Sequence, residues 1–318
     1  MSKGEADMLA GSLKVSGRPL TKRVIRHRSI YLMALPAFIW YAVFCYQPMY
    51  GVLLAFKDYK FNMGILHSPW VGLKYFSQFL YTSEFWSIIK NTVVISGLKL
   101  LLGFPAPIIL ALLMNEITHQ KYKRVIQTFS YLPHFVSWVV VATLMNIIFT
   151  PYGGVVNSIR MRAFDLPAIF FMGEQRFFYP VIVLSDIWKG AGWGTIIYLA
   201  AITNINPELY EAAICDGAGK MSCMWHITLP GILPTAGIMF ILATGGILNA
   251  NMDQVLLLQK PSNIVVSQIL DTYVLKVGIR EGRFGFATAV GLFKSVFSAA
   301  LVFTTNWVSK KVTEISIW

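Results

Sequence analysis

The chain has 318 residues, of which 56% are hydrophobic and only 13% are charged, and its net charge is +12. Ordinary soluble domains carry about 25% charged residues, so this composition argues against a soluble enzyme and predicts a polytopic membrane protein. The positive charge does not indicate nucleic-acid binding, because much of it lies in an N-terminal arm, where it keeps a segment in the cytoplasm and attracts anionic lipids. The basic residues of that arm are Lys3, Lys14, Arg18, Lys22, Arg23, Arg26 and Arg28.

Six apolar stretches are each long enough for a transmembrane helix, which needs about 20 residues. They lie at about residues 30–56, 85–114, 125–149, 180–202, 231–258 and 284–308. We therefore expect an all-α fold with a basic cytoplasmic arm and interfacial helix at residues 1–28, followed by a transmembrane domain at residues 29–318. Six spans put both termini on one side. The basic residues of the arm and of the 115–124 link predict that this side is the cytoplasm.

A polar insert at residues 203–230 separates the fourth and fifth predicted spans. Asn206 followed by Pro207 predicts a helix start, and Gly217 and Gly219 end that helix before a second short one that runs toward Pro230. The insert cannot lie within the bilayer, because it carries charged and titratable side chains. They are Glu208, Glu211, Asp216, Lys220 and His226. Such an insert is either a docking surface or an ordinary cytoplasmic loop, and periodicity alone leaves both open.

Charged and aromatic residues interrupt the fourth predicted span. Asp186 and Lys189 lie three positions apart on one helix face, so they can neutralise one another, either as a structural ion pair or as part of a solute pathway. Trp188 and Trp193 flank them and can stack on sugar rings or anchor the helix at the membrane interface. Of three glycines nearby, we expect two to permit close helix packing. The three are Gly190, Gly192 and Gly194.

The third and fifth predicted spans also carry polar groups. The fifth ends in Thr244, Gly245, Gly246, Asn249, Asn251 and Asp253. Neutral amides suit sugar hydroxyls, because each offers a donor and an acceptor without a charge to desolvate. On the third span, His134, Ser137 and Trp138 follow Leu132-Pro133. We expect His134 to pack between helices rather than to carry protons.

The polar insert contains a specific motif. Glu211-Ala212-Ala213 is followed after three residues by Gly217, and after nine more by Ile227-x-Leu229-Pro230. This pattern resembles the EAA signature of ABC importer permeases. Further stretches, among them YLPHFVSWVVV at 131–141 and SDIWKGAGWGTIIYLAA at 185–201, look like the LplB-type branch of the maltose-type, binding-protein-dependent sugar permeases.

The resemblance implies a type I ABC importer permease with six transmembrane helices, located in a bacterial cytoplasmic membrane. In that family the insert is the coupling helix, which rests in a cleft of the cytoplasmic ATPase. The positions that match or adjoin the motif, and so are expected to couple to the ATPase, are Glu208, Glu211, Ala212, Ala213, Asp216, Gly217, Ile227, Leu229 and Pro230. Among them, we expect Asp216 to cap the second short helix.

The resemblance also implies partners. They are a second homologous permease, an ABC ATPase dimer, an extracytoplasmic solute-binding lipoprotein and an oligosaccharide substrate. The chain contains no Walker A pattern (GxxxxGK[ST]), so we expect a transport subunit that is not itself an enzyme, with ATP and Mg on the separate ATPase. We expect this chain to bind no cofactor or metal, since its three cysteines are scattered without metal-ligand spacing.

Maltose-type importers contact sugar from three places, and these suggest where a solute is held here. The corresponding residues are His134 and Trp138 on the third span, Asp186, Trp188, Lys189 and Gly190 on the fourth, and Gly246 and Asn249, with Asp253 beyond them, on the fifth. Asp186 and Lys189 are charged where those relatives are neutral. This departure suggests a larger or charged saccharide, such as one that bears uronic acids.

Three other functions are open at this point. A permease for amino acids or phosphonates would share the EAA-like insert and differs in what its receptor binds. A secondary transporter would need no ATPase and would keep its uptake when ATP is depleted. A membrane enzyme is disfavoured, because the spans show neither a nucleophile–base pair nor a metal-ligand pattern.

Overall fold

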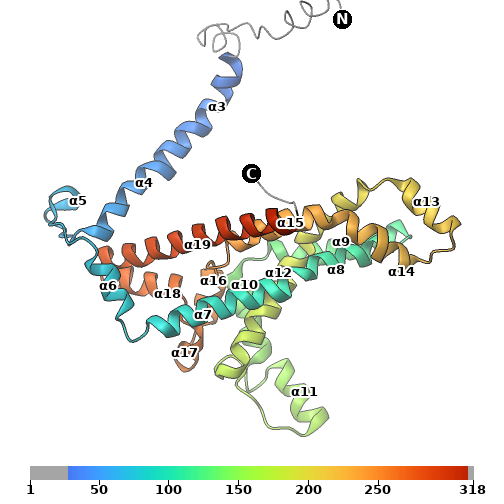
Figure 1. The fold of residues 1–318 in the computed structure, drawn as a ribbon. Coiled ribbons are helices and arrows are strands. Elements are labelled where there is room, and N and C mark those ends of the chain that lie inside the picture. Colours follow the sequence, from blue (N-terminus) through green and yellow to red (C-terminus); the bar gives the residue numbers. More distant parts are fainter. Residues whose placement is uncertain (1–27, 314–318) are drawn as a thin grey trace, which may run out of the picture. The chain divides into compact units, whose positions relative to one another are not determined.

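The computed structural model describes residues 28–313, and the ordered elements within that range are helices (Figure 1). The chain divides into two compact units, residues 1–53 and residues 54–318. The described part of the first unit holds α3 (Arg28–Tyr41) and α4 (Gln47–Met49). A continuous helical run of 29 residues, Arg28–Phe56, matches the first predicted span. The predicted basic arm lies outside the described residues, apart from Arg28.

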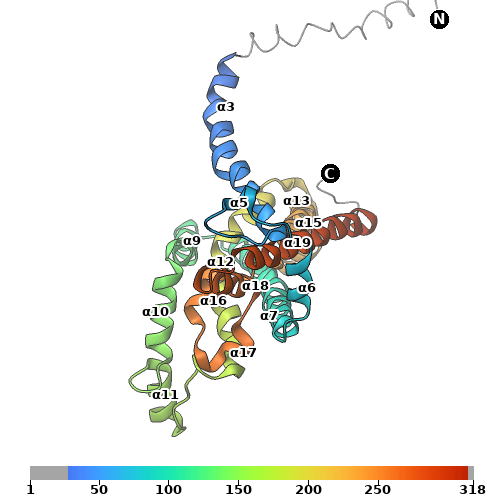
Figure 2. The same ribbon diagram turned by 90° about the vertical axis from the view of Figure 1, so that its left-hand side faces the viewer.

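The second unit contains the remaining α-helices, and six of them have seven residues or fewer. In chain order they are α5 (Gly64–His67), α6 (Lys74–Leu80), α7 (Phe85–Leu98), α8 (Pro105–Asn115), α9 (Gln120–Phe135), α10 (Trp138–Phe149), α11 (Val155–Phe164), α12 (Gln175–Thr203), α13 (Pro207–Cys215), α14 (Lys220–Cys223), α15 (Leu229–Gly245), α16 (Met252–Leu258), α17 (Ile264–Ser267), α18 (Leu270–Leu275) and α19 (Phe284–Thr313). Within this unit, α7, α8, α15 and α19 run lengthwise between one end that carries α13 and another that carries α6, while α11 projects sideways (Figures 1 and 2).

Four described helical runs are long and apolar enough to cross a membrane, and a bent pair raises the number to five. The four are Arg28–Phe56, Phe85–Asn115, Lys220–Gly245 and Phe284–Lys311. The fourth predicted span corresponds to α12, which has 29 residues but is not among these runs. Its charged residues, Asp186 and Lys189, lower its hydropathy. By length and composition, the described residues thus contain four or five of the six predicted spans.

The third predicted span is not a single helix. It is the bent pair α9 and α10, whose axes differ by 100° at Val136–Ser137. Ser137 has extended backbone angles and caps α10, since its Oγ accepts a hydrogen bond from the N–H of Val140 at 3.4 Å. The Leu132-Pro133 pair thus lies near the end of α9, not at the start of a span.

The fifth predicted span, at 231–258, differs at both ends. Its helix begins inside the polar insert at Lys220 and runs to Gly245, so the expected second short helix of the insert is the first turns of the span. A non-helical segment at 246–251 follows, and α16 then starts after Asn251, which adopts a left-handed conformation (φ +62°). Asn tolerates this conformation better than most residues with a side chain, so it permits the sharp change of direction.

Prolines account for the irregular turns within the long helices. π-helical turns at Ala42–Tyr46, Lys99–Gly103 and Met224–Thr228 each end two residues before a proline. The three prolines are Pro48, Pro105 and Pro230. A proline has no N–H to donate to the preceding turn, so the carbonyls there rearrange into a wider turn and the helix continues.

Helix α12 is the centre of the second unit, because it packs against α8, α9 and α15. Two of its glycines make this close packing possible. A Cβ at Gly192 would lie 1.9 Å from the carbonyl oxygen of Ser130, and a Cβ at Gly194 would lie 2.8 Å from Pro107. Gly190 has nothing within 4 Å of its Cβ position. This confirms that two of the three glycines serve packing and leaves Gly190 on an open face.

Replacing Gly192 with Ala is expected to destabilise the protein by about 1–3 kcal/mol, because the α9 backbone would have to move away from α12. The matched control is Gly190→Ala, which meets open space and should change stability by less than about 1 kcal/mol, since Ala is the better helix former. Thermal unfolding of the detergent-solubilised protein measures both changes. Equal unfolding temperatures for the two variants would contradict the proposed close contact.

Candidate functional site

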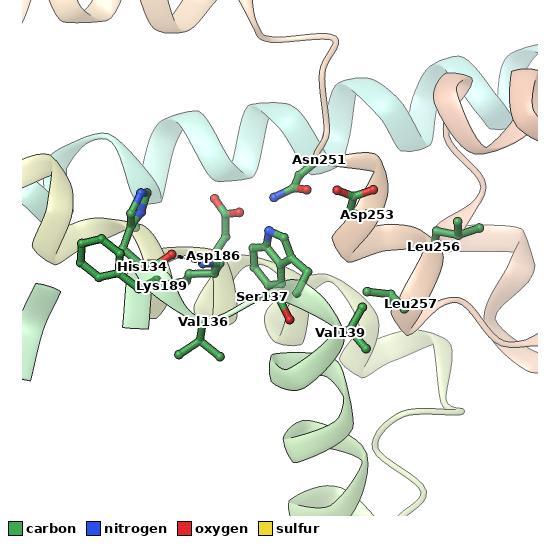
Figure 3. Close-up of a pocket in the computed structure, with 13 residues that line it drawn as sticks. His134, Val136, Ser137, Val139, Asp186, Lys189, Asn251, Asp253, Leu256 and Leu257 are labelled. Carbon is green, nitrogen blue, oxygen red and sulfur yellow. Dashed lines mark hydrogen bonds between the residues drawn. The ribbon is translucent and has the colours of Figure 1, made fainter. Parts of the chain in front are cut away.

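A cavity in the second unit lies between the α9–α10 bend, α12 and α16 (Figure 3). Its volume is about 810 Å³, and we call it the main cavity. It is lined by His134, Phe135, Val136, Ser137, Trp138, Val139, Asp186, Lys189, Gly190, Asn251, Asp253, Leu256 and Leu257. The bend therefore brings backbone and side-chain polar groups to a place where a straight apolar helix would present only hydrocarbon.

Lys189 holds the end of α9. Its Nζ donates hydrogen bonds to the carbonyl oxygens of Pro133 at 3.3 Å and His134 at 2.5 Å. Both carbonyls belong to the last turn of α9, where helical partners are missing and the helix dipole favours a positive charge. The His134 ring stacks on Trp193 of α12, with centroids 4.6 Å apart and the planes within 5°. His134 thus packs against α12, as expected, and also borders the cavity.

Asp186 pairs with a lysine on another helix, which corrects the predicted Asp186–Lys189 ion pair. Lys99, at the start of the π-helical turn after α7, lies 3.2 Å from the Asp186 carboxylate. Its Nζ also donates to the carbonyl oxygen of Ala250 at 3.0 Å and to Gln254 Oε1 at 2.5 Å. Gln254 in turn donates to the Ser185 hydroxyl at 2.8 Å. This network ties α7 and α12 to the break between α15 and α16.

A second cavity of about 340 Å³ adjoins the main one. It is lined by Ser96, Lys99, Leu100, Phe104, Asp186, Ala243, Gly246, Ile247, Asn249 and Asn251. Two of these residues, Asp186 and Asn251, line both cavities. Figure 3 shows their side chains reaching toward one another from α12 and from the segment before α16.

The structure divides the predicted pathway residues into three groups. His134, Trp138, Asp186, Lys189, Gly190 and Asp253 line the main cavity, while Gly246 and Asn249 line the second. Trp188 lies elsewhere: it is 53% exposed and borders a separate apolar groove with residues of α10 such as Leu144. It is therefore not placed to stack on a solute in either cavity. Residue 188 follows Asp186 by two positions, and two steps along a helix turn a side chain to the opposite face.

Sequence analysis did not assign a role to Lys99, Gln254 or Ser96. Of these three residues, only Lys99 could have been recognised as functional from the sequence, because a lysine deep in an apolar span needs a partner of opposite charge. The sequence did not show that this partner is Asp186. Asp186 is 87 residues from Lys99 along the chain but only three residues from Lys189, which therefore looked like its partner.

The polar insert lies at one end of the bundle, where α13 extends beyond the long helices (Figure 1). Asn206 caps α13 by accepting a hydrogen bond from the N–H of Glu208 at 3.1 Å, as predicted. Gly217 has φ +82° and makes the turn that a residue with a side chain rarely adopts. The Tyr210 and Thr228 hydroxyls lie 2.9 Å apart and connect α13 to the start of the next span.

The exposed face of the polar insert is partly apolar. It carries Leu209, Ile214, Met221 and Trp225, each more than half exposed, together with the exposed Glu208 and Glu211. Asp216 does not cap the second helix, because Gly219 occupies that position; Asp216 instead follows the last residue of α13. Exposed apolar side chains beside charged ones are typical of a protein-binding surface.

Polar cavities within a bundle of membrane-length helices define a membrane transport protein rather than an enzyme or a structural anchor. Residues 103–314 match the family described as "Binding-protein-dependent transport system inner membrane component". The chain belongs to this family, and it is a permease subunit in the cytoplasmic membrane.

Two curated relatives from Bacillus subtilis (strain 168) cover nearly the whole chain. Protein LplB is 44% identical over 309 residues, which is 97% of this chain and 96% of LplB. The polygalacturonan/rhamnogalacturonan transport system permease protein YteP is 42% identical over 305 residues, 96% of this chain and 95% of YteP.

Solved structures give the same fold. A chain of a bacterial ABC transporter involved in the import of the acidic polysaccharide alginate matches with a TM-score of 0.85 and 38% identity, covering 92% of this chain and 99% of that one. A chain of the alginate transporter in complex with an alginate pentasaccharide-bound periplasmic protein matches with a TM-score of 0.86 and 37% identity, covering 94% and 100%.

Lys189→Met is expected to loosen the α9–α10 bend, because two carbonyls at the end of α9 lose their donor at a cost of about 1–3 kcal/mol. Lys189→Arg is the control, since it keeps a cation and several donors. Spin labels on Val125→Cys in α9 and Ile147→Cys in α10, in a background without native cysteines, report the distance across the bend. The Met variant should broaden the distance distribution and the Arg variant should not. Identical narrow distributions for both would contradict the assigned role of Lys189.

Proposed function

We propose that this chain is the transmembrane subunit of an ATP-driven importer for oligosaccharides that carry acidic sugar residues. The observation that carries the proposal is Lys189. Its ammonium lines the main cavity at membrane depth and forms no ion pair with a carboxylate in the described part of the chain. A cation that donates hydrogen bonds only to backbone carbonyls keeps capacity for an anionic partner, which a sugar carboxylate would supply.

The rest of the main cavity suits a carbohydrate. Asn251 and Ser137 offer neutral polar groups that can hydrogen-bond to hydroxyls, and Trp138 provides an aromatic ring beside them. The Lys189 Nζ lies 5.6 Å from the centre of that ring. The relatives support the same solute class, since YteP is described as a polygalacturonan/rhamnogalacturonan permease and the matched structures as an importer of acidic alginate.

Energy for transport would come from a separate ATPase that binds the polar insert. The exposed apolar and acidic side chains of α13 and its following turn form the surface, with Glu211 and Gly217 placing and shaping it. Ala212, Ala213, Ile227, Leu229 and Pro230 complete the EAA-like motif. Packing beside the insert is tight, because a Cβ at Gly231 of α15 would lie 2.6 Å from Ile205, in the link before α13, so movement of this link would pass to α15.

The remaining partners follow from the family. A second homologous permease would supply the other half of the pathway, and a solute-binding protein would deliver the oligosaccharide to the outer loops. Closure of the ATPases would then rock the helices around the two cavities, which alternately face the two sides. In this scheme ATP and Mg belong to the ATPase, and both termini of this chain lie in the cytoplasm.

Lys189→Gln is expected to reduce uptake of an acidic oligosaccharide by about tenfold or more, because a charge-assisted hydrogen bond is worth about 1.5–3 kcal/mol. The glutamine amide can still donate to the α9 carbonyls, so the bend is retained. Uptake is measured in proteoliposomes that contain the full complex, with alginate pentasaccharide or oligogalacturonate as probes. The control probe is the carboxyl-reduced form of each sugar. The proposed substrate class would be contradicted if the variant lost uptake of acidic and reduced sugars equally. It would also be contradicted if the wild-type complex took up only the reduced sugars.

Glu211→Lys and Gly217→Asp are expected to leave the protein in the membrane but to abolish transport and copurification of the ATPase. The first reverses a charge on the insert, and the second strains the turn at φ +82°. Matched controls are Glu281→Lys and Gly282→Asp, because Glu281 is also exposed and Gly282 also has a positive φ of +68°. These controls should keep the ATPase bound. Retention of the ATPase by both insert variants would remove the coupling role.

A further inference from the structure

The main and second cavities meet at a charged pair. Asp186 lines both cavities and is paired with Lys99, which lines only the second. Asn251 lines both as well, and its left-handed backbone (φ +62°) is held at this junction. Strained backbone of this kind persists where the surrounding structure fixes it, often at functional sites. The boundary between the two cavities is therefore ionic rather than a plug of apolar side chains.

One residue that lines the second cavity has a buried polar atom without a hydrogen-bond partner among the described residues. This atom is the side-chain oxygen of Ser96. Ser96 lies three residues before Lys99 on the same helical run, so both side chains line this cavity. The amide of Asn249 lies across from them on the break after α15. A buried hydroxyl without a partner is unfavourable, so a hydroxylated ligand that reached Ser96 would be stabilised by it.

Of the three hydrogen bonds that Lys99 donates, the one to Asp186 is the longest. It measures 3.2 Å, against 3.0 Å to Ala250 and 2.5 Å to Gln254, while charge-assisted N–H···O bonds are usually about 2.7–2.9 Å. The Asp186 side chain is also the more exposed member of the pair, at 32% against 11% for Lys99. The other two partners, Ala250 and Gln254, are fully buried, so Asp186 is the partner of Lys99 that a ligand can reach.

We propose that the second cavity is a separate binding site for one acidic sugar residue, and that the sugar carboxylate takes the place of Asp186 on Lys99. Exchange of one carboxylate for another keeps the Lys99 ammonium neutralised within the membrane. A neutral sugar that displaced Asp186 would instead leave a buried charge without its partner, which is strongly unfavourable. The pair therefore admits acidic residues and excludes neutral ones.

Displaced Asp186 has a second cation within reach. Lys189 lies one helical turn further along α12, so the Asp186 carboxylate can turn toward it when it leaves Lys99. Both negative charges, from the sugar and from Asp186, then face one ammonium each. The exchange alters hydrogen bonds and ion pairs only, and no covalent bond forms or breaks.

This inference rests on the proposed uptake of acidic oligosaccharides and is tested with the double variant Lys99→Gln/Asp186→Asn in the full complex. The variant keeps a hydrogen-bonded pair of similar size but removes both charges. Initial uptake rates are measured in proteoliposomes over a range of alginate pentasaccharide and carboxyl-reduced pentasaccharide concentrations. We expect the preference for the acidic over the reduced sugar, as the ratio of kcat/KM values, to fall at least tenfold.

The matched control is Lys294→Gln/Asp271→Asn. Lys294 and Asp271 form another largely buried ion pair, with Nζ 2.5 Å from the carboxylate and both side chains 19% exposed, and they line neither cavity. This control should lower uptake of both sugars in parallel without changing their ratio. An unchanged ratio in the Lys99→Gln/Asp186→Asn variant would overturn the exchange. A wild-type complex without any preference for the acidic sugar would instead refute the proposed function itself.

A second measurement decides the case if the double variant does not assemble. Ser96→Cys, in a background without Cys45, Cys215 and Cys223, places a thiol in the second cavity. During ATP turnover a small methanethiosulfonate reagent should modify it, and saturating alginate pentasaccharide should slow that reaction at least fivefold. The carboxyl-reduced sugar should give no protection. A thiol that never reacts, or that reacts equally fast with and without the acidic pentasaccharide, would overturn the site.

Discussion

The need to neutralise two lysines at membrane depth governs the centre of this structure. A lone ammonium among apolar helices is costly, so Lys99 and Lys189 are each surrounded by acceptors. Lys99 takes a carboxylate, an amide oxygen and a backbone carbonyl, and Lys189 takes two backbone carbonyls. In both cases the backbone acceptors come from a place where a helix is interrupted. The lysines and the helix breaks thus stabilise each other: the ammonium groups gain acceptors, and the free backbone carbonyls gain donors.

These breaks create the cavities. A straight helix uses its own carbonyls internally and presents only side chains, whereas an interrupted helix exposes polar backbone. Here the α9–α10 bend and the 246–251 segment both border cavities that α12 lines with Asp186 and Lys189. Close packing through Gly192 and Gly194 fixes α12 against its neighbours, so the polar groups are held in place while Gly190 leaves room beside them. The same helix ends next to the polar insert, and this connects the cavities to the surface that we propose binds the ATPase.

Much of the fold and part of the site were predictable. Apolar stretches located the first, second and sixth spans within a few residues, and Asn206 and Gly217 defined α13 because capping and positive φ depend on one or two residues. The polar residues of α12 were correctly singled out because charge in a span is rare. Their partners were not, since Lys99 is 87 residues from Asp186 and nothing local distinguishes it from Lys189. Trp188 lines neither cavity for a related reason: residue type allowed either stacking on a sugar or anchoring at the interface, and the helix turns that side chain toward a separate apolar groove.

The sequence by itself determined that this chain is an all-helical membrane protein with an EAA-like insert between two spans, because composition, length and local capping act over short distances. It also determined which charges must lie in the membrane. Tertiary structure alone decided how those charges pair, where α9 bends and where α15 stops, because each outcome depends on acceptors brought together from helices far apart in the chain. The position of the cavities follows from those pairings, so it too was set by packing rather than by any single segment.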